Sequence, residues 1–191
     1  SHARYFAALA KGTENETIAA ELDNLRIAWR HSVAGRNLER VNVLRMVLWP
    51  IFEARGWYQA AIELSDDLLG IIVASPDSPD RWQEKLTLMT KRARAMMLLR
   101  GYTAEVEDAY ADALALVREH GEVPQIFPVL RSLGSLHALR GEFDKGIRYS
   151  NEILRLAVVE GDGSMIVDGY SMLGASTGFS GHLETGLGYL D

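Results

Sequence analysis

The sequence predicts an all-α fold, a right-handed α-α superhelix of about nine helices arranged as helical hairpins. Three observations predict it: apolar residues recur at helical spacing, no segment shows a convincing strand pattern, and turn glycines recur about every 40 residues. The glycines Gly56, Gly101, Gly141 and Gly181 each follow an apolar helical pattern, and a bulky residue follows each within two positions. A repeat of this length is typical of hairpins that stack and share one core.

The predicted helices follow from these patterns in chain order. Residues 13–34 carry apolar side chains three or four positions apart, and Thr13 with Glu16 matches a capping box. A second helix of this kind begins after Ser78, with Pro79 at its first position. The three clearest stripes are Ile18, Leu22, Leu25, Trp29 and Val33; Trp82, Leu86, Met89, Ala93 and Met96; and Phe143, Ile147, Ser150, Leu154 and Ala157.

We expect residues 1–191 to form a single helical-repeat domain. The first helices occupy residues 1–36, and the hairpins occupy residues 37–75, 76–120, 121–161 and 162–191. The last hairpin is incomplete, because only ten residues follow Gly181. Its apolar side chains would stay exposed to solvent without further helices. The chain is therefore expected to be a fragment, with more repeats after Asp191.

Composition excludes several classes of protein. An apolar share of 48% with 24% charged residues is ordinary for a globular protein. A net charge of −6 argues against nonspecific electrostatic binding to nucleic acid or anionic lipid. The longest apolar runs are far shorter than the ~20 residues of a membrane span. The absence of cysteine excludes disulfides and thiolate sites, and the cytoplasm is the expected compartment.

The last two repeats resemble the tetratricopeptide pattern. The residues at its apolar and small positions are Leu130, Leu133, Gly134, Phe143 and Leu154 in one repeat, and Tyr170, Leu173, Gly174, Leu183 and Gly186 in the next. The period of 40 is longer than the ~34 residues of that family. Glycine replaces the usual alanine at Gly146 and Gly186, and the family proline is absent. The resemblance implies long, irregular tetratricopeptide-like hairpins.

A second resemblance concerns function. Residues 21–29 and 48–58 are similar to the helical region that follows the nucleotide-binding module of bacterial signal-transduction (STAND) ATPases. Residues 100–102, 105–110 and 124–130 are similar to the subgroup of these proteins that is linked to adenylate cyclases. That group includes large LuxR-type transcriptional regulators and class III adenylate cyclases with attached ATPase and tetratricopeptide regions. The resemblance implies a sensor or effector-coupling arm, with the ATPase and the output domain outside this chain.

One short pattern matches a hydrolase motif. Residues 174–178 read G-x-S-x-G around Ser176, and Asp168 and His182 are near in sequence. A nucleophile elbow needs a strand before the serine and a helix after it, whereas both flanks read here as one helix. We therefore interpret residues 174–178 as small residues at a contact between the helices of a hairpin. A serine esterase is kept as a remote alternative.

The other chemistry-bearing residues form no recognisable site. The five histidines are dispersed without paired metal-ligand spacing, and His120 and His182, beside turn glycines, are expected at the surface. Glu107 and Asp108 are adjacent, so on a helix they point about 100° apart and are expected on a solvated face. No phosphate-binding glycine motif is present. The sequence predicts no catalytic residue, no metal site and no cofactor.

The remaining functional surface is the concave wall formed by the first helix of each hairpin. Counting back from each turn glycine, the predicted groove residues are Met46, Glu53, Lys91, Leu98, Arg131, Ser135, Ser171 and Phe179. Lys91 and Arg131 occupy equivalent positions, which suggests a cationic ladder for a carboxylate or an acidic peptide. Two solvated basic residues on an acidic protein are the alternative interpretation.

We expect a non-catalytic protein-interaction or sensor module of a multidomain bacterial signalling or transcriptional regulator. It would bind a protein, a peptide segment or a neighbouring domain of the same chain through its concave surface, without direct contact to nucleic acid or membrane. The alternative is a small-effector sensor that holds its ligand inside the superhelix against Met46, Leu98 and Phe179. Self-association into a homo-oligomer stays open.

Overall fold

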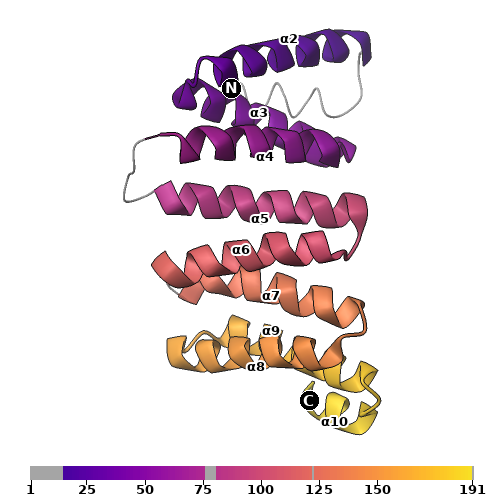
Figure 1. Cartoon of the computed structure of the whole chain (residues 1–191). Helices are drawn as coiled ribbons and strands as arrows, with labels where there is room; N and C mark the ends of the chain where they lie inside the picture. Colours follow the sequence, from indigo (N-terminus) through magenta and orange to yellow (C-terminus); the bar gives the residue numbers. More distant parts are fainter. Residues whose placement is uncertain (1–14, 76–80, 122, 191) are drawn as a thin grey trace. The chain divides into compact units, whose positions relative to one another are not determined.

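The computed structural model describes residues 15–75, 81–121 and 123–190, which are helices joined by turns (Figure 1). The helices are α2 (Asn15–Ala34), α3 (Leu38–Arg55), α4 (Tyr58–Val73), α5 (Arg81–Arg100), α6 (Ala104–His120), α7 (Val123–Leu139), α8 (Phe143–Glu160), α9 (Gly163–Phe179) and α10 (Leu183–Gly188). These ranges contain nine helices and no strand, which confirms the predicted all-α class. None of the described helices is long and apolar enough to span a bilayer.

The chain divides into two compact units, Ser1–Leu99 and Arg100–Asp191, and each is described by itself. In the N-terminal unit α2 packs on α3 and α3 packs on α4. In the C-terminal unit each helix from α6 to α10 packs on the next one. The division falls beside the turn at Gly101, so the hairpin predicted for residues 76–120 contributes one helix to each unit.

Glycines in the left-handed conformation lie at the predicted turns. Gly56, Gly101, Gly141 and Gly181 have φ angles of 66°, 72°, 77° and 100°, a region that side chains with a Cβ rarely adopt. After Gly141, the N–H of Glu142 donates to the carbonyl of His137 at 2.9 Å. Such bonds satisfy carbonyls that the helix end leaves without partners. The predicted spacing of the turns is therefore confirmed.

Two side chains cap helix N-termini. The Asn37 side chain accepts a bond from the N–H of Arg40 at the start of α3. Asp162 accepts from the N–H groups of Ser164 and Met165 at the start of α9, and these donors hold the pKa of Asp162 below its usual value. The predicted caps at Thr13 and Ser78 lie outside the described residues.

Apolar side chains fill the interior of each unit. Buried core residues include Leu22, Trp29, Leu48, Phe52, Leu64 and Leu68 in the N-terminal unit, and Val106, Tyr110, Leu130, Leu133, Leu136 and Ile153 in the C-terminal unit. Buried Ser65 and Ser150 each donate to a backbone carbonyl one turn earlier in their helix, at 2.8 and 2.9 Å. Fully burying one such large apolar side chain stabilises a fold by about 1.5–3 kcal/mol.

Glycines let the last two helices touch along their backbones. A Cβ added to Gly186 of α10 would lie 2.7 Å from both the carbonyl oxygen of Gly174 and the amide nitrogen of Gly178 in α9. No side chain fits into that space, since carbon atoms meet at about 3.5–4.0 Å. The predicted role of small residues at this hairpin contact is therefore confirmed.

The short helix α10 leaves apolar side chains uncovered. Leu183, Leu187 and Leu190 are all exposed, while the ring of Tyr189 lies 6.3 Å from the ring of Tyr170 on α9. The expectation that further repeats would cover this stripe stays a prediction.

Substituting Gly186→Ala should destabilise the C-terminal unit by about 1–3 kcal/mol, because the new methyl group would meet backbone that cannot move aside. Gly188→Ala is the matched control, since a Cβ there meets nothing within 4 Å. Thermal unfolding followed by circular dichroism measures both. Equal melting temperatures for the two variants would contradict the close contact.

Candidate functional site

The predicted groove residues all lie on the first helix of a hairpin. Met46 and Glu53 lie on α3, Lys91 and Leu98 on α5, Arg131 and Ser135 on α7, and Ser171 and Phe179 on α9. Met46 and Phe179 are each 73% exposed. The α3 and α5 residues belong to the N-terminal unit and the others to the C-terminal unit, so they form two sets.

Lys91 lies over an aromatic ring. Its Nζ is 4.8 Å from the centroid of the Trp49 ring, a cation–π contact between α5 and α3. Burial lowers the pKa of Lys91, and the neighbouring Arg45 and Arg94 lower it further, while Glu53 opposes them. The structure therefore brings the predicted residues Lys91 and Glu53 into electrostatic contact, within a surrounding of mostly positive charge.

The same face of α3 holds buried polar atoms that the sequence analysis missed. Oδ1 of Asn42, Nε of Arg45 and Nε1 of Trp49 are buried without a hydrogen-bond partner among the described residues. Their spacing of three and four residues places them in one row along the helix. That spacing is the sequence signal that could have found them.

Arg131 has a different environment. Its Nε lies 3.2 Å from a carboxylate oxygen of Asp168 on α9, so an acidic partner already neutralises it. Elsewhere in the C-terminal unit, the centroid of the Phe179 ring lies 6.5 Å from that of the Phe143 ring. The two basic residues of the predicted ladder thus differ: Arg131 has a carboxylate partner, and Lys91 rests on an indole.

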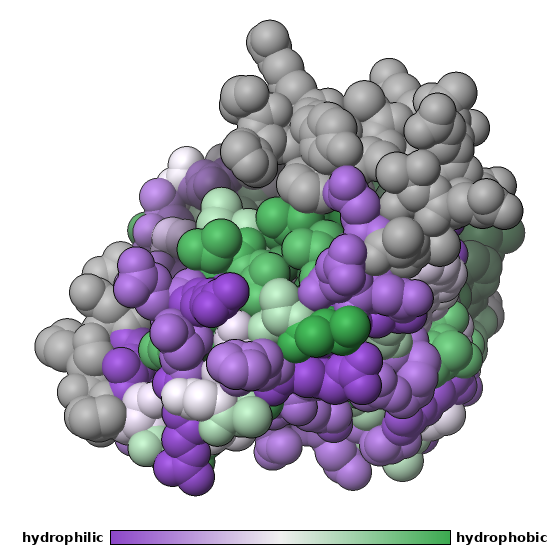
Figure 2. All heavy atoms as spheres, turned by 90° about the horizontal axis from the view of Figure 1, so that it is seen from above, coloured by the Kyte–Doolittle hydropathy of each residue, from purple (hydrophilic) through white to green (hydrophobic). Residues whose placement is uncertain are grey.

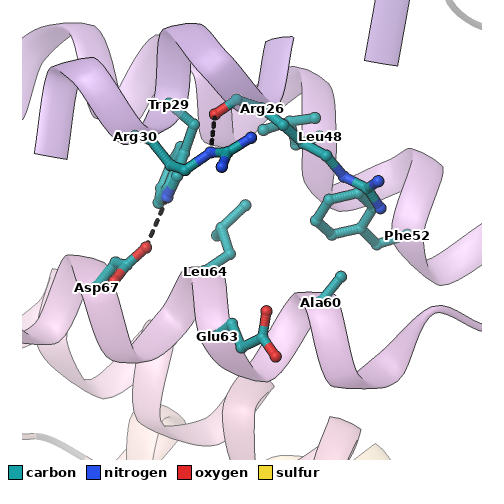
Figure 3. Close-up of a pocket in the computed structure, with 9 residues that line it drawn as sticks. All are labelled: Arg26, Trp29, Arg30, Leu48, Phe52, Ala60, Glu63, Leu64 and Asp67. Carbon is teal, nitrogen blue, oxygen red and sulfur yellow. Dashed lines mark hydrogen bonds between the residues drawn. The ribbon is translucent and has the colours of Figure 1, made fainter. Parts of the chain in front are cut away.

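A pocket of about 490 Å³ opens between α2, α3 and α4 (Figure 3). Its lining residues are Arg26, Trp29 and Arg30 from α2, Leu48 and Phe52 from α3, and Ala60, Glu63, Leu64 and Asp67 from α4. Viewed from the α2 end, the surface shows a patch of hydrophobic side chains with hydrophilic side chains to either side of it and below it (Figure 2). The pocket therefore combines apolar and charged groups in the N-terminal unit.

The positive and the negative groups of this pocket lie on different helices. Arg26 and Arg30 are four residues apart on α2, and Glu63 and Asp67 are four residues apart on α4. Asp67 accepts a hydrogen bond from Nε1 of Trp29 at 2.8 Å. This site was not predicted from the sequence. Its signal is the like-charge spacing on two helices, which becomes meaningful only when their pairing is known.

A second cluster surrounds His137, which is only 1% exposed. Its Nδ1 lies 2.9 Å from Oε2 of Glu142 and its Nε2 lies 3.5 Å from Oε1 of Glu107. Because an ionised carboxylate only accepts, the Nδ1 proton is donated to Glu142. The ring also stacks on Tyr149, 5.5 Å away. The expectation that Glu107 sits on a solvated face is wrong, because it turns inward to these partners; His120 and His182 are exposed as predicted.

Basic side chains neutralise the two acids of this cluster. Arg140 binds Glu107 and Glu142, and Nζ of Lys145 lies 2.8 Å from Glu142. Partial burial raises the pKa of Glu107, but the Arg140 bond and the charges of His137 and Lys145 outweigh it and leave the pKa lowered. Bonds from Lys145 and His137 lower the pKa of Glu142.

The cluster also has the geometry of a cation site. Ligand atoms of Glu107, His137 and Glu142 all lie within 4.8 Å of one another, a set that histidine spacing in the sequence did not predict. Arg140 and Lys145 already place positive charge on the same carboxylates. The arrangement is therefore best described as an ionic cluster that joins α6, α7 and α8.

Ser176 has no nucleophile-elbow geometry. It lies inside α9 and is 1% exposed. Its Oγ packs against Gly146 of α8, where an added Cβ would lie only 3.0 Å from it. An elbow would instead lift the hydroxyl into solvent between a strand and a helix. The residues of the G-x-S-x-G pattern serve close packing of α8, α9 and α10.

Comparisons with known proteins support the fold. No protein-family model matches the sequence, and no curated protein matches it. The structure is similar to the crystal structure of BtubC (BKLC) from P. vanneervenii, with a TM-score of 0.70 and 15% sequence identity, over 99% of this chain and 77% of that one. At this identity the likeness shows the fold alone, a helical-repeat-like arrangement of hairpins.

Substituting Glu107→Gln should lower the melting temperature at pH 7 by about 3–6 °C, because about 1–2 kcal/mol of charged hydrogen bonding is lost. The folded pKa of Glu107 lies below its usual 4.5. Its contribution is therefore present above that value and is lost as the pH falls through the folded pKa. Melting curves at pH 7, 5, 4 and 3 should show the gap between wild type and variant closing.

The neighbouring substitution Asp108→Asn is the matched control for that series. It removes the same charge from the same turn of α6, but Asp108 is exposed. A gap that stays constant with pH, or an equal loss in both variants, would contradict the role of the cluster.

Proposed function

We propose that this chain is a non-catalytic protein-interaction module that binds a protein or peptide segment through the first helices of its hairpins. The resemblance of residues 21–29 and 48–58 to signal-transduction ATPases supports a place in a multidomain bacterial signalling or transcriptional regulator, in the cytoplasm. In this proposal the module couples binding to an output domain of the parent protein.

The observation that carries the proposal is the exposure of large apolar side chains on the first helices. Met46 on α3 and Phe179 on α9 are each 73% exposed, at positions predicted to face a groove. Each lies on a helix that its neighbours in the unit hold in place. A surface formed in advance loses little conformational entropy when a partner docks.

The test uses an array of random 12-residue peptides probed with the labelled chain. Met46→Glu should reduce about tenfold the signal of peptides that bind the N-terminal unit, and Phe179→Glu the signal of peptides that bind the C-terminal unit, because a central apolar anchor is worth more than 1 kcal/mol.

The chain offers matched controls on second helices. Val73 of α4 and Val159 of α8 are 72% and 73% exposed, so Val73→Glu and Val159→Glu change a comparable apolar surface elsewhere. Both controls should keep the wild-type signal. Failure of the wild type to bind any peptide, or equal losses in all four variants, would refute binding through the first helices.

The α2–α4 pocket supports a second candidate function, the sensing of a small effector. Its volume of about 490 Å³ lies in the range of about 300–1,000 Å³ that is typical of ligand sites. This location differs from the one expected from the sequence, beside Met46, Leu98 and Phe179.

Filling the pocket tests this second function. A metabolite panel should contain a compound that raises the melting temperature, and Ala60→Trp should abolish that shift because Ala60 lines the pocket. Ala54→Trp, at an exposed position of α3, should leave it intact. A shift that survives in Ala60→Trp would place the effector elsewhere.

A further inference from the structure

We propose that the α2–α4 pocket binds a short peptide with free amino and carboxyl ends, a zwitterion with apolar side chains. The inference rests on the second candidate function, to which it gives a ligand class. It is independent of binding through the first helices, because none of the eight predicted groove residues lines this pocket.

The opposed charges of the pocket carry the inference. Arg26 and Arg30 extend from α2, and Glu63 and Asp67 extend from α4 on the other side of the pocket (Figure 3). Like charges four residues apart on a helix repel each other, so each helix alone would be more stable without its pair. Two positive and two negative groups give the pocket no net charge, and a ligand with both charges complements both walls.

The guanidinium groups of the two arginines are not equally available. Arg26 is held over the rings of Phe52 and Trp57, 5.9 and 5.4 Å from their centroids. Arg30 is exposed, and its Nε makes a long bond of 3.5 Å to the backbone carbonyl of Arg26. Its guanidinium can therefore present two N–H donors to a carboxylate, the geometry that arginine favours.

The acids on α4 keep accepting capacity for an ammonium group. Glu63 accepts one bond from Gln59 at 3.0 Å, and Asp67 accepts one from Trp29 at 2.8 Å. A carboxylate has about four lone-pair sites, so both retain free positions among the described residues. The Trp29 bond also orients the Asp67 carboxylate (Figure 3).

The apolar part of the pocket selects the body of the ligand. Leu48, Phe52 and Leu64 line it and are almost fully buried, so this part of the wall offers no hydrogen-bond partner to a polar side chain of the ligand, and an apolar one fits it better. A purely anionic ligand would meet the carboxylates of Glu63 and Asp67, and a purely cationic one would meet the arginines. A zwitterionic peptide with apolar side chains avoids both conflicts.

The experiment titrates the chain with leucyl-phenylalanine by calorimetry. The free dipeptide should bind at least tenfold more tightly than its N-acetylated form and its C-amidated form, because each modification removes one charge. No measurable binding by the free dipeptide, or equal binding by the modified forms, would overturn the proposal.

Variants assign the two charges to the two walls. Arg30→Gln and Glu63→Gln should each weaken binding of the free dipeptide at least tenfold. Arg30→Gln should bind the C-amidated form no more weakly than wild type does, because that form has no carboxylate for Arg30 to bind. Arg40→Gln and Glu39→Gln remove exposed charges of α3 outside the pocket and should leave binding unchanged. Equal losses in these controls would overturn the assignment.

Failure of this inference is distinguishable from failure of the proposed functions. If leucyl-phenylalanine does not bind but Ala60→Trp blocks the shift caused by another metabolite, the sensor function stands and the zwitterion is rejected. The peptide array with Met46→Glu and Phe179→Glu reports on the first helices alone.

Discussion

Reversal of the chain at a left-handed glycine is the constraint on which the rest of the structure depends. At Gly56, Gly101, Gly141 and Gly181 the backbone adopts a positive φ that costs other residues energy. At Gly56, Gly141 and Gly181, which lie within the units, the reversal brings the next helix back along the previous one, so their apolar stripes meet and their outer faces stay open. The first helices expose Met46 and Phe179. The α2–α4 pocket lies between three consecutive helices, which are joined by turns with a positive φ at Arg36 and at Gly56.

Charge is distributed differently in the two units. Around His137 the acids and bases touch, and the pKa values of Glu107 and Glu142 fall because each carboxylate has cationic partners. In the α2–α4 pocket opposite charges line facing helices across an open space. Ion pairs between charged side chains join the helices that carry them. Charged side chains that lie apart across a pocket keep hydrogen-bonding capacity for a ligand. The first arrangement is structural, and the second is the better candidate for recognition.

The sequence predicted the elements better than the sites. Helical spacing and the turn glycines predict the nine described helices, because both signals are local and each turn needs a positive φ. The inward orientation of Glu107 depends on His137 and Arg140, about 30 residues further along the chain, which no local pattern reveals. The pocket between Arg30 and Glu63 likewise depends on which helices pack together. The predicted groove residues lie on the first helices of the hairpins, and their role in a groove stays a prediction. The ion pair of Arg131 with Asp168 could not be predicted from spacing.

The recurring turns and the close helix contacts limit how such a chain can change its length. The turns recur about every 40 residues, and the backbone contact at Gly186 is one such close contact. A hairpin touches mainly its immediate neighbours. Duplication or loss of one whole hairpin would therefore preserve the junctions on either side, whereas insertion of a few residues inside a helix would rotate one face away from its contacts. This architecture therefore tolerates a change of chain length by whole hairpins.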